Sequence, residues 1–285
     1  MIYKRSNMFN GFGILIFKAV ILTGNIFSSC WLSFSLWKQA EGGKGVKAET
    51  EEVSSALNEV LTFPSVKGRD IKVYIFNGKQ SSATTLVIGG VHGDERSGIK
   101  LAHALLADLQ SRSIDDFKAR VIVIPVANPD GYAANTRVNA RGIDINRNFP
   151  TKDFRQGSLT KYCNPGKEAA SEPETQAILK IIDEYKPELI LSFHANIGCV
   201  NYDGPAEEIA KTISAKNGLP VRKDIGYATP GSMGTYYGRE RNIPIITFEL
   251  LTKDNQWERH GRVTLETIGV TQSEEDERKE VRHEA

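Results

Sequence analysis

The order of apolar runs along the chain is the feature that most constrains its fold. Five short runs rich in branched and aromatic residues are typical of strands, and three longer stretches between them are typical of helices. This alternation predicts an α/β fold, a twisted central sheet with helices on both faces. The strand-like runs are residues 71–76, 85–91, 121–127, 189–193 and 243–250, and the helix-like stretches are 98–109, 175–185 and 205–216.

A histidine and a glutamate lie three residues apart just after the second strand-like run, in the segment GVHGDE. Imidazole and carboxylate groups are good zinc ligands, and a catalytic zinc commonly takes three protein ligands and one water. His92 and Glu95 are two candidates. His194 is the third, because it ends the run 189–193, and ligands of open α/β sheets bind beyond the carboxyl ends of strands. A lone histidine there would more often be a packed core residue, but the upstream pair favours a ligand. The other histidines are His103, His260 and His283.

A carboxylate also stands among hydrophobic neighbours in the run 243–250. Burying an unpaired carboxylate is costly, so Glu249 must be paired, neutralised or functional. Burial would raise its pKa, which suits a general base acting on a metal-bound water. The alternative is an edge residue with its carboxylate in solvent.

The segment after the third strand-like run combines a turn with a polar block. Its Asn-Pro-Asp-Gly sequence, residues 128–131, is typical of a turn. The block TRVNARGIDINRNFP, residues 136–150, is rich in arginine and asparagine, and a guanidinium group matches a carboxylate in shape and charge. The block therefore predicts either a binding site for an anionic group or a solvated basic loop.

Taken together, these segments resemble the zinc metallocarboxypeptidases of the carboxypeptidase A type, and most closely the bacterial branch that includes murein peptide amidases. The resemblance covers roughly residues 60–252 and implies a mixed sheet and one zinc ion per chain. The matching segments, in order, are GVHGDE, NPDGY, TRVNARGIDINRNFP, SEPETQA, SFHA, GYATPGSMG and IPIITFEL.

The resemblance implies a role for each matching position. His92, Glu95 and His194 would hold zinc. Glu249 would activate the water and pass its proton to the leaving amine, while Arg137 would stabilise the oxyanion.

The implied substrate-binding residues are Asn146 and Arg147, which would bind the free carboxylate of the substrate. The larger enzymes of the family also have a tyrosine that closes over the substrate. The segment GSMGTYY resembles that region in shortened form, so Tyr237 is the candidate, with Tyr236 the second choice and an ordinary packing contact the alternative.

The implied substrate is a small peptide derived from the cell wall, cleaved at the bond between γ-D-glutamate and diaminopimelate. The segments SEPETQA and GYATPGS point that way, although Ser171 and Glu174 also predict a capping box that would report only helix geometry. The alternatives are a general zinc carboxypeptidase, a zinc deacylase of N-acyl amino acids, and a non-catalytic peptidoglycan-binding protein. The last is disfavoured because every ligand and the base are present.

The chain has 285 residues and divides by composition into a terminal segment, a linker, a catalytic domain and a tail. Residues 1–38 are apolar after Lys4 and Arg5, which predicts a signal peptide or membrane anchor, with lipidation at Cys30 a third option and a buried helix the alternative. Residues 39–57 are a polar linker, 58–271 the catalytic domain and 272–285 a charged tail. The enzyme is therefore expected to be exported: periplasmic, membrane-attached or secreted.

Two further features bound the prediction. Lys plus Arg number 36 and Asp plus Glu 35, so no basic excess suggests nucleic-acid binding. Cys163 and Cys199 could pair in an oxidising compartment, but sequence leaves that open.

Overall fold

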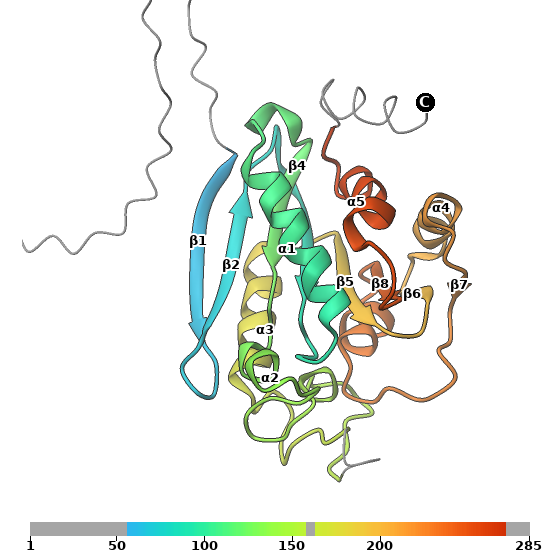
Figure 1. Cartoon of the computed structure of the whole chain (residues 1–285). Coiled ribbons are helices and arrows are strands. Elements are labelled where there is room, and N and C mark those ends of the chain that lie inside the picture. Colours follow the sequence, from blue (N-terminus) through green and yellow to red (C-terminus); the bar gives the residue numbers. More distant parts are fainter. Residues whose placement is uncertain (1–55, 158–162, 272–285) are drawn as a thin grey trace, which may run out of the picture. The chain divides into compact units, whose positions relative to one another are not determined.

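A computed structural model describes residues 56–157 and 163–271, which build a mixed sheet covered by helices (Figure 1). In this part of the chain the sheet has eight strands in the order β1-β2-β4-β3-β5-β8-β6-β7. The strands are β1 (Leu57–Pro64), β2 (Asp70–Phe76), β3 (Gln80–Gly89), β4 (Ala119–Ile124), β5 (Leu189–Ala195), β6 (Cys199–Asp203), β7 (Val221–Arg222) and β8 (Ile245–Leu250). The helices are α1 (Arg96–Gln110), η1 (Ile114–Asp116), α2 (Pro129–Ala134), η2 (Ile145–Arg147), α3 (Pro173–Tyr185), α4 (Glu207–Asn217), η3 (Gly234–Arg239) and α5 (Gln256–Thr267).

The centre of the sheet consists of four neighbouring parallel strands, β4, β3, β5 and β8. Strand β3 continues through α1 to β4 on one side, whereas β5 lies on the other side of β3. The strand order therefore reverses between β3 and β5. In open α/β sheets ligands bind outside the carboxyl ends of the strands at such a reversal, because the connections diverge and leave a crevice.

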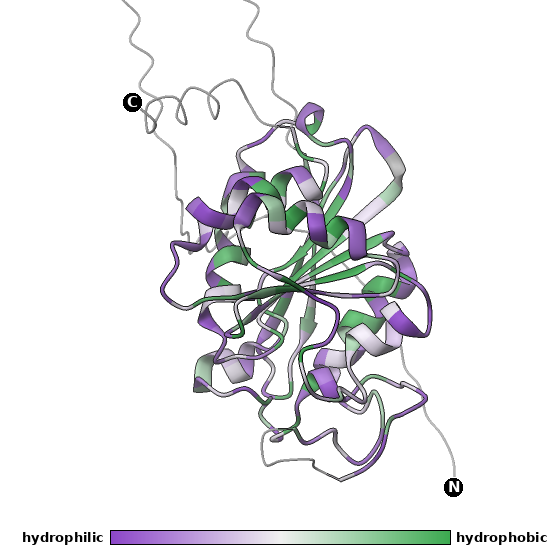
Figure 2. Ribbon diagram, turned by 90° about the vertical axis from the view of Figure 1, so that its right-hand side faces the viewer, coloured by the Kyte–Doolittle hydropathy of each residue, from purple (hydrophilic) through white to green (hydrophobic). Residues whose placement is uncertain are grey.

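Alternating side chains of the central strands pack into two hydrophobic cores. On β3, Val87 packs into the core that contains residues of α1, α4 and α5, while Leu86 and Ile88 pack into the core that contains residues of α3. Figure 2 shows the hydrophobic strands in the interior and the hydrophilic turns of the helices facing outward. This two-sided burial explains why the central strands read as continuous apolar runs.

The predicted α/β fold with a mixed sheet and helices on both faces is confirmed, and all five strand-like runs and three helix-like stretches form the expected elements. The sequence did not predict the edge strands β1 and β7, the short strand β6, or the helices α2 and α5. The prediction of a turn at the Asn-Pro-Asp-Gly sequence is wrong, because these residues begin helix α2. Asn128 caps this helix by accepting a hydrogen bond from Gly131 N (2.8 Å), and Pro129 is its first residue.

The prediction of a capping box formed by Ser171 and Glu174 is also wrong. Helix α3 begins at Pro173 after Glu172, whose side chain makes no cap hydrogen bond. Glu174 is fully buried and instead accepts hydrogen bonds from Val66 N (3.1 Å) and Asn139 Nδ2 (3.0 Å). The SEPETQA segment therefore ties α3 to two distant loops.

The predicted terminal segment (1–38), all of the linker except its last two residues, and the tail (272–285) lie outside the described residues. Strand β1 begins at Leu57, the last residue of the predicted linker. Among the residues that the structure does describe, no helix has the length and apolar character needed to cross a membrane.

Candidate active site

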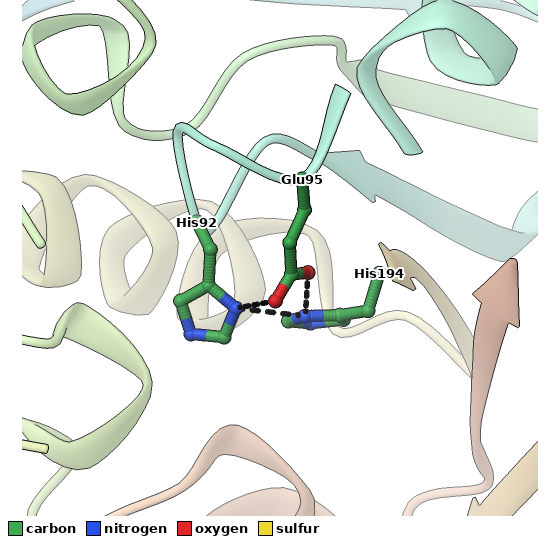
Figure 3. A group of neighbouring side chains, drawn as sticks. All are labelled: His92, Glu95 and His194. Carbon is green, nitrogen blue, oxygen red and sulfur yellow. Dashed lines mark hydrogen bonds and ion pairs between the residues drawn. The ribbon is translucent and has the colours of Figure 1, made fainter. Parts of the chain in front are cut away.

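Three side chains converge at the point where the strand order reverses: His92, Glu95 and His194 (Figure 3). His92 lies just beyond β3, Glu95 immediately precedes α1, and His194 lies near the end of β5. Glu95 occupies the N-cap position of α1 but makes no side-chain cap hydrogen bond, because its carboxylate is turned into the site, where Oε2 accepts from Ala195 N (3.0 Å). A hydrogen bond to the side chain of an N-cap Ser, Thr, Asp or Asn typically stabilises a helix by about 1 kcal/mol. Helix α1 lacks this stabilisation because its N-cap residue serves the site.

The loop that carries His92 packs closely against helix α2. A Cβ atom added to Gly93 would lie 1.9 Å from the backbone carbon of Gly131, so only glycine allows the GVHGDE loop to pack against α2. The GVHGDE and NPDGY segments therefore depend on each other, although more than 30 residues separate them in sequence.

The distances between donor atoms fit a metal ion. One donor atom from each side chain lies within 4.8 Å of the other two. The Nδ1 atoms of His92 and His194 are 3.1 Å apart, and two nitrogens bound to tetrahedral zinc at about 2.0–2.1 Å would be separated by about 3.3–3.4 Å. The carboxylate oxygens of Glu95 lie 2.7 Å from His92 Nδ1 and 2.8 Å from His194 Nδ1.

The electrostatics of this cluster also favour a cation. Burial alone would lower the pKa of His92, but the carboxylates of Glu95 and Asp144 outweigh it and raise that pKa to about 9. Burial opposes ionisation of Glu95, yet the two histidines hold its pKa well below its usual range. The three side chains thus stabilise a positive charge placed between them, and a divalent metal ion would supply such a charge.

A buried carboxylate that the sequence analysis did not single out supports His92 from behind. Asp144 is fully buried, and its Oδ1 lies 3.2 Å from His92 Nε2. Its Oδ2 accepts a hydrogen bond from Arg137 Nε (3.0 Å), and the neighbouring positive groups hold the pKa of Asp144 well below its usual range against the effect of burial. A carboxylate bound to the far nitrogen fixes the ring orientation and the tautomer of a metal-binding histidine.

Arg137 completes this group from the polar block. Its Nη1 donates to Glu95 Oε1 (3.1 Å) while its Nε is held by Asp144, so the guanidinium plane is fixed beside the metal ligands. The backbone carbonyl of Arg137 accepts a hydrogen bond from Asn128 Nδ2 (3.3 Å), which links the arginine to the cap of α2. Its side chain remains partly exposed toward the pocket.

Asn146 and Arg147 form a second cationic region in the same pocket. Arg147 is only 4% exposed, and its Nη1 donates to Asn146 O (2.7 Å), but its buried Nε has no partner among the described residues. The Oδ1 of Asn146 accepts from Met233 N (2.9 Å), which orients the amide so that Nδ2 is left for a ligand. A buried guanidinium with an unused donor is suited to bind an anion.

Glu249 lies beside the three candidate metal ligands, on β8, paired in register with His194 on β5. It is buried, and its Oε2 makes no hydrogen bond among the described residues. Burial raises its pKa above the ordinary value, and Glu95 adds to this shift. An unpaired, partly desolvated carboxylate next to a metal site has the properties of a general base.

The placement of Tyr237 is a correction. Its side chain is 2% exposed and packs in the hydrophobic core with Phe149 and Tyr236, so it does not line the pocket. The tyrosine that does line the pocket is Tyr227, which is 54% exposed and lies in the GYATPGSMG segment. The sequence gives no clear signal for this choice, because glycines flank both tyrosines.

The two described cysteines are both free thiols, so they do not form the disulfide that sequence left open. Cys199 is buried on β6, opposite Glu249, and burial followed by the nearby carboxylate raises its pKa to about 11. It is therefore a packed thiol rather than a metal ligand.

Fold and site together are those of a metallohydrolase, with the candidate metal ligands and the candidate base at the carboxyl ends of parallel strands. The zinc carboxypeptidase family profile matches residues 49–208, and the chain belongs to this family of hydrolases. Murein peptide amidase A of Vibrio campbellii is 33% identical over 225 residues, which cover 74% of this chain and 87% of the relative. Murein peptide amidase A of Escherichia coli K12 is 32% identical over 180 residues, covering 59% and 72%. The crystal structure of the murein-tripeptide amidase of Escherichia coli O157 superimposes with a TM-score of 0.64 at 24% identity, over 76% of this chain and 94% of that one.

Proposed function

We propose that the protein is a zinc-dependent amidase that cleaves murein peptides at the bond between γ-D-glutamate and diaminopimelate. One observation carries the proposal: a single pocket joins the three candidate ligands, the carboxylate of Glu249 and the guanidinium of Arg147. The names of the bacterial relatives support the choice of substrate. The polar block thus forms a substrate site rather than a solvated loop.

In this proposal His92, Glu95 and His194 hold one zinc ion, which when bound polarises the substrate carbonyl and makes a water molecule more acidic. Glu249 accepts the proton of the attacking water. It then donates this proton to the amine that leaves, which its raised pKa favours.

The two arginines act at different ends of the reacting group. Arg137, fixed by Asp144 and Glu95, directs its guanidinium at the oxyanion that forms on the carbonyl. Arg147 and Asn146, which line the pocket side by side, bind the carboxylate next to the scissile bond. Tyr227 replaces Tyr237 as the residue that we propose to close over the substrate.

The test is hydrolysis of L-Ala-γ-D-Glu-meso-diaminopimelate by the purified protein, with zinc measured on the same sample. Release of free diaminopimelate is expected from the wild type and not from Glu249→Gln. A zinc-loaded wild type that cleaves ordinary C-terminal peptides but not this one would instead indicate a general carboxypeptidase. Cleavage of N-acyl amino acids alone would indicate a deacylase.

We also propose that the catalytic domain acts outside the cytoplasm, because the apolar segment within residues 11–37 follows Lys4 and Arg5 without an acidic residue. Fractionation of cells that express the full chain, with mass analysis of the mature N-terminus, distinguishes a cleaved signal, lipidation at Cys30 and an intact anchor. Recovery of the full-length chain in the cytoplasm alone would contradict export.

A further inference from the structure

The pocket continues away from the metal ligands along the neighbouring strands β6 and β8. Directly opposite residues on antiparallel strands share a face, and Glu249 lies opposite Cys199 while Thr247 lies opposite Asn201. Asn201, Thr247 and then Asp203 line the pocket along this face. Asp203 is four residues beyond Cys199, about 13 Å along the strand at about 3.3 Å per residue. Only a long side chain of a substrate bound at the metal would reach it.

An ion pair closes this far end of the pocket. Arg239, the last residue of η3, donates from Nε to Asp203 Oδ1 (2.7 Å). The carboxylate of Asp203 is 10% exposed, and a Cβ atom added to Gly234 would lie 2.2 Å from its Oδ2. Glycine at 234 therefore leaves room for the carboxylate, which any larger residue would displace.

The guanidinium of Arg239 is incompletely used. Its side chain is more than half exposed, and among the described residues its only hydrogen bond comes from Nε, so both terminal nitrogens are available. The exposed carboxylate of Asp224 also lines this end of the pocket. A second hollow shares Asp203, Asp224 and Arg239 with this pocket and is also lined by Tyr202, Gly204 and Lys223.

Both signs of charge thus meet at one depth of the pocket, apart from the carboxylate anchor at Arg147. A substrate side chain ending in an ammonium group alone would compete with Arg239 for the carboxylate of Asp203 and leave the guanidinium without an anion. One ending in a carboxylate alone would face Asp203 and Asp224. A side chain that carries both groups on its last carbon satisfies both sets of partners.

We propose that Asp203, Asp224 and Arg239 form a subsite for a zwitterionic side-chain end, with Arg239 binding its carboxylate and the two aspartates its ammonium. The proposal rests on the proposed function and deepens it, because diaminopimelate has such a side chain. It follows that the enzyme distinguishes diaminopimelate from lysine, which lacks the distal carboxylate, and from 2-aminopimelate, which lacks the distal ammonium.

The experiment compares kcat/KM for three peptides, L-Ala-γ-D-Glu-X, in which X is meso-diaminopimelate, L-lysine or L-2-aminopimelate. Loss of one charge-assisted hydrogen bond predicts a preference for diaminopimelate of about 10- to 100-fold over each of the others. Arg239→Gln is expected to abolish the preference over lysine, and Asp203→Asn the preference over 2-aminopimelate. Arg241→Gln is the matched control, because Arg241 is nearby but stacks on Tyr236 outside the pocket, so this variant should keep both preferences.

If the ion pair between Arg239 and Asp203 serves only to hold η3 on β6, Arg239→Gln should lower kcat/KM for all three peptides by the same factor. Unchanged ratios between the peptides would therefore overturn the subsite. Equal kcat/KM for the diaminopimelate and lysine peptides in the wild type would also overturn it, while leaving the proposed amidase activity intact. A zinc-loaded wild type that cleaves none of the three peptides would overturn the proposed function and the subsite with it.

Discussion

Replacing Asp144 by asparagine tests the support behind the metal ligands. The carboxylate is fully buried and contacts His92 Nε2 (3.2 Å) through one oxygen and Arg137 Nε (3.0 Å) through the other. Asparagine keeps a single acceptor, so it can serve His92 or Arg137 but not both, and it removes the negative charge that makes the imidazole a stronger ligand. Loss of such a partner typically weakens metal binding 10- to 100-fold, which is about 1.4–2.7 kcal/mol.

The assay is competition for zinc between the purified protein and a chelator of known affinity at fixed pH. Asp130→Asn is the matched control, because Asp130 is also buried and bound to an arginine, Arg69, but lies outside the pocket. We expect the Kd for zinc to rise in Asp144→Asn and to stay at the wild-type value in the control. A folded Asp144→Asn protein with wild-type zinc affinity would show that Asp144 does not support His92 as a metal ligand.

Four further predictions follow from the site and the core. Glu249→Gln should bind zinc normally but lose about 10²- to 10⁴-fold in kcat, and a near-normal kcat in steady-state assays would exclude it as the base. Arg147→Ala should raise KM about tenfold or more while lowering kcat less, because the anchor acts already in the ground state; an unchanged KM would contradict that role. Tyr227→Phe should lower kcat/KM, whereas Tyr237→Phe should leave kcat/KM within about twofold of wild type, because the Tyr237 hydroxyl is buried outside the pocket and has no hydrogen-bond partner among the described residues. A larger effect of Tyr237→Phe than of Tyr227→Phe would show that Tyr237 acts on the substrate. His260 is fully buried, and burial lowers its pKa to about 4, so the unfolded chain binds this proton at a higher pH than the folded protein does. The free energy of unfolding should therefore fall by at most about 3 kcal/mol between pH 6.5 and 4. Denaturant titrations of His260→Leu should lack this loss, and an equal pH dependence of the free energy of unfolding in wild type and variant would contradict the prediction.

The sequence predicted the fold well where burial dictates the residue pattern. The strands β3, β4 and β5 are buried on both faces, so their apolar runs are unambiguous. Strand β6 is short and carries Asn201, whose side chain binds the backbone of Arg222 and Lys223, and no local pattern reveals that tertiary bond. The start of α2 at Pro129 reads as a turn because proline and glycine are common in both structures.

The same distinction applies to the site. His92, His194 and Glu249 stand out because they are polar residues at the ends of apolar runs, and the structure brings them together. Asp144 lies in a polar block where no single carboxylate is conspicuous, and its importance comes from burial that only the fold creates. The shortened motif GSMGTYY predicts Tyr237, with Tyr236 as the second choice, but Tyr237 packs against Phe149, a tertiary contact that no local pattern reveals.

Titration of the metal-free enzyme with zinc, with release of diaminopimelate measured at each addition, shows whether one zinc ion per chain carries the activity. We expect activity to rise linearly and to reach its plateau at one zinc per chain, and we expect His194→Ala neither to retain stoichiometric zinc nor to gain activity. Full activity of the metal-free protein, or a His194→Ala variant that binds one zinc and cleaves the peptide normally, would contradict this expectation.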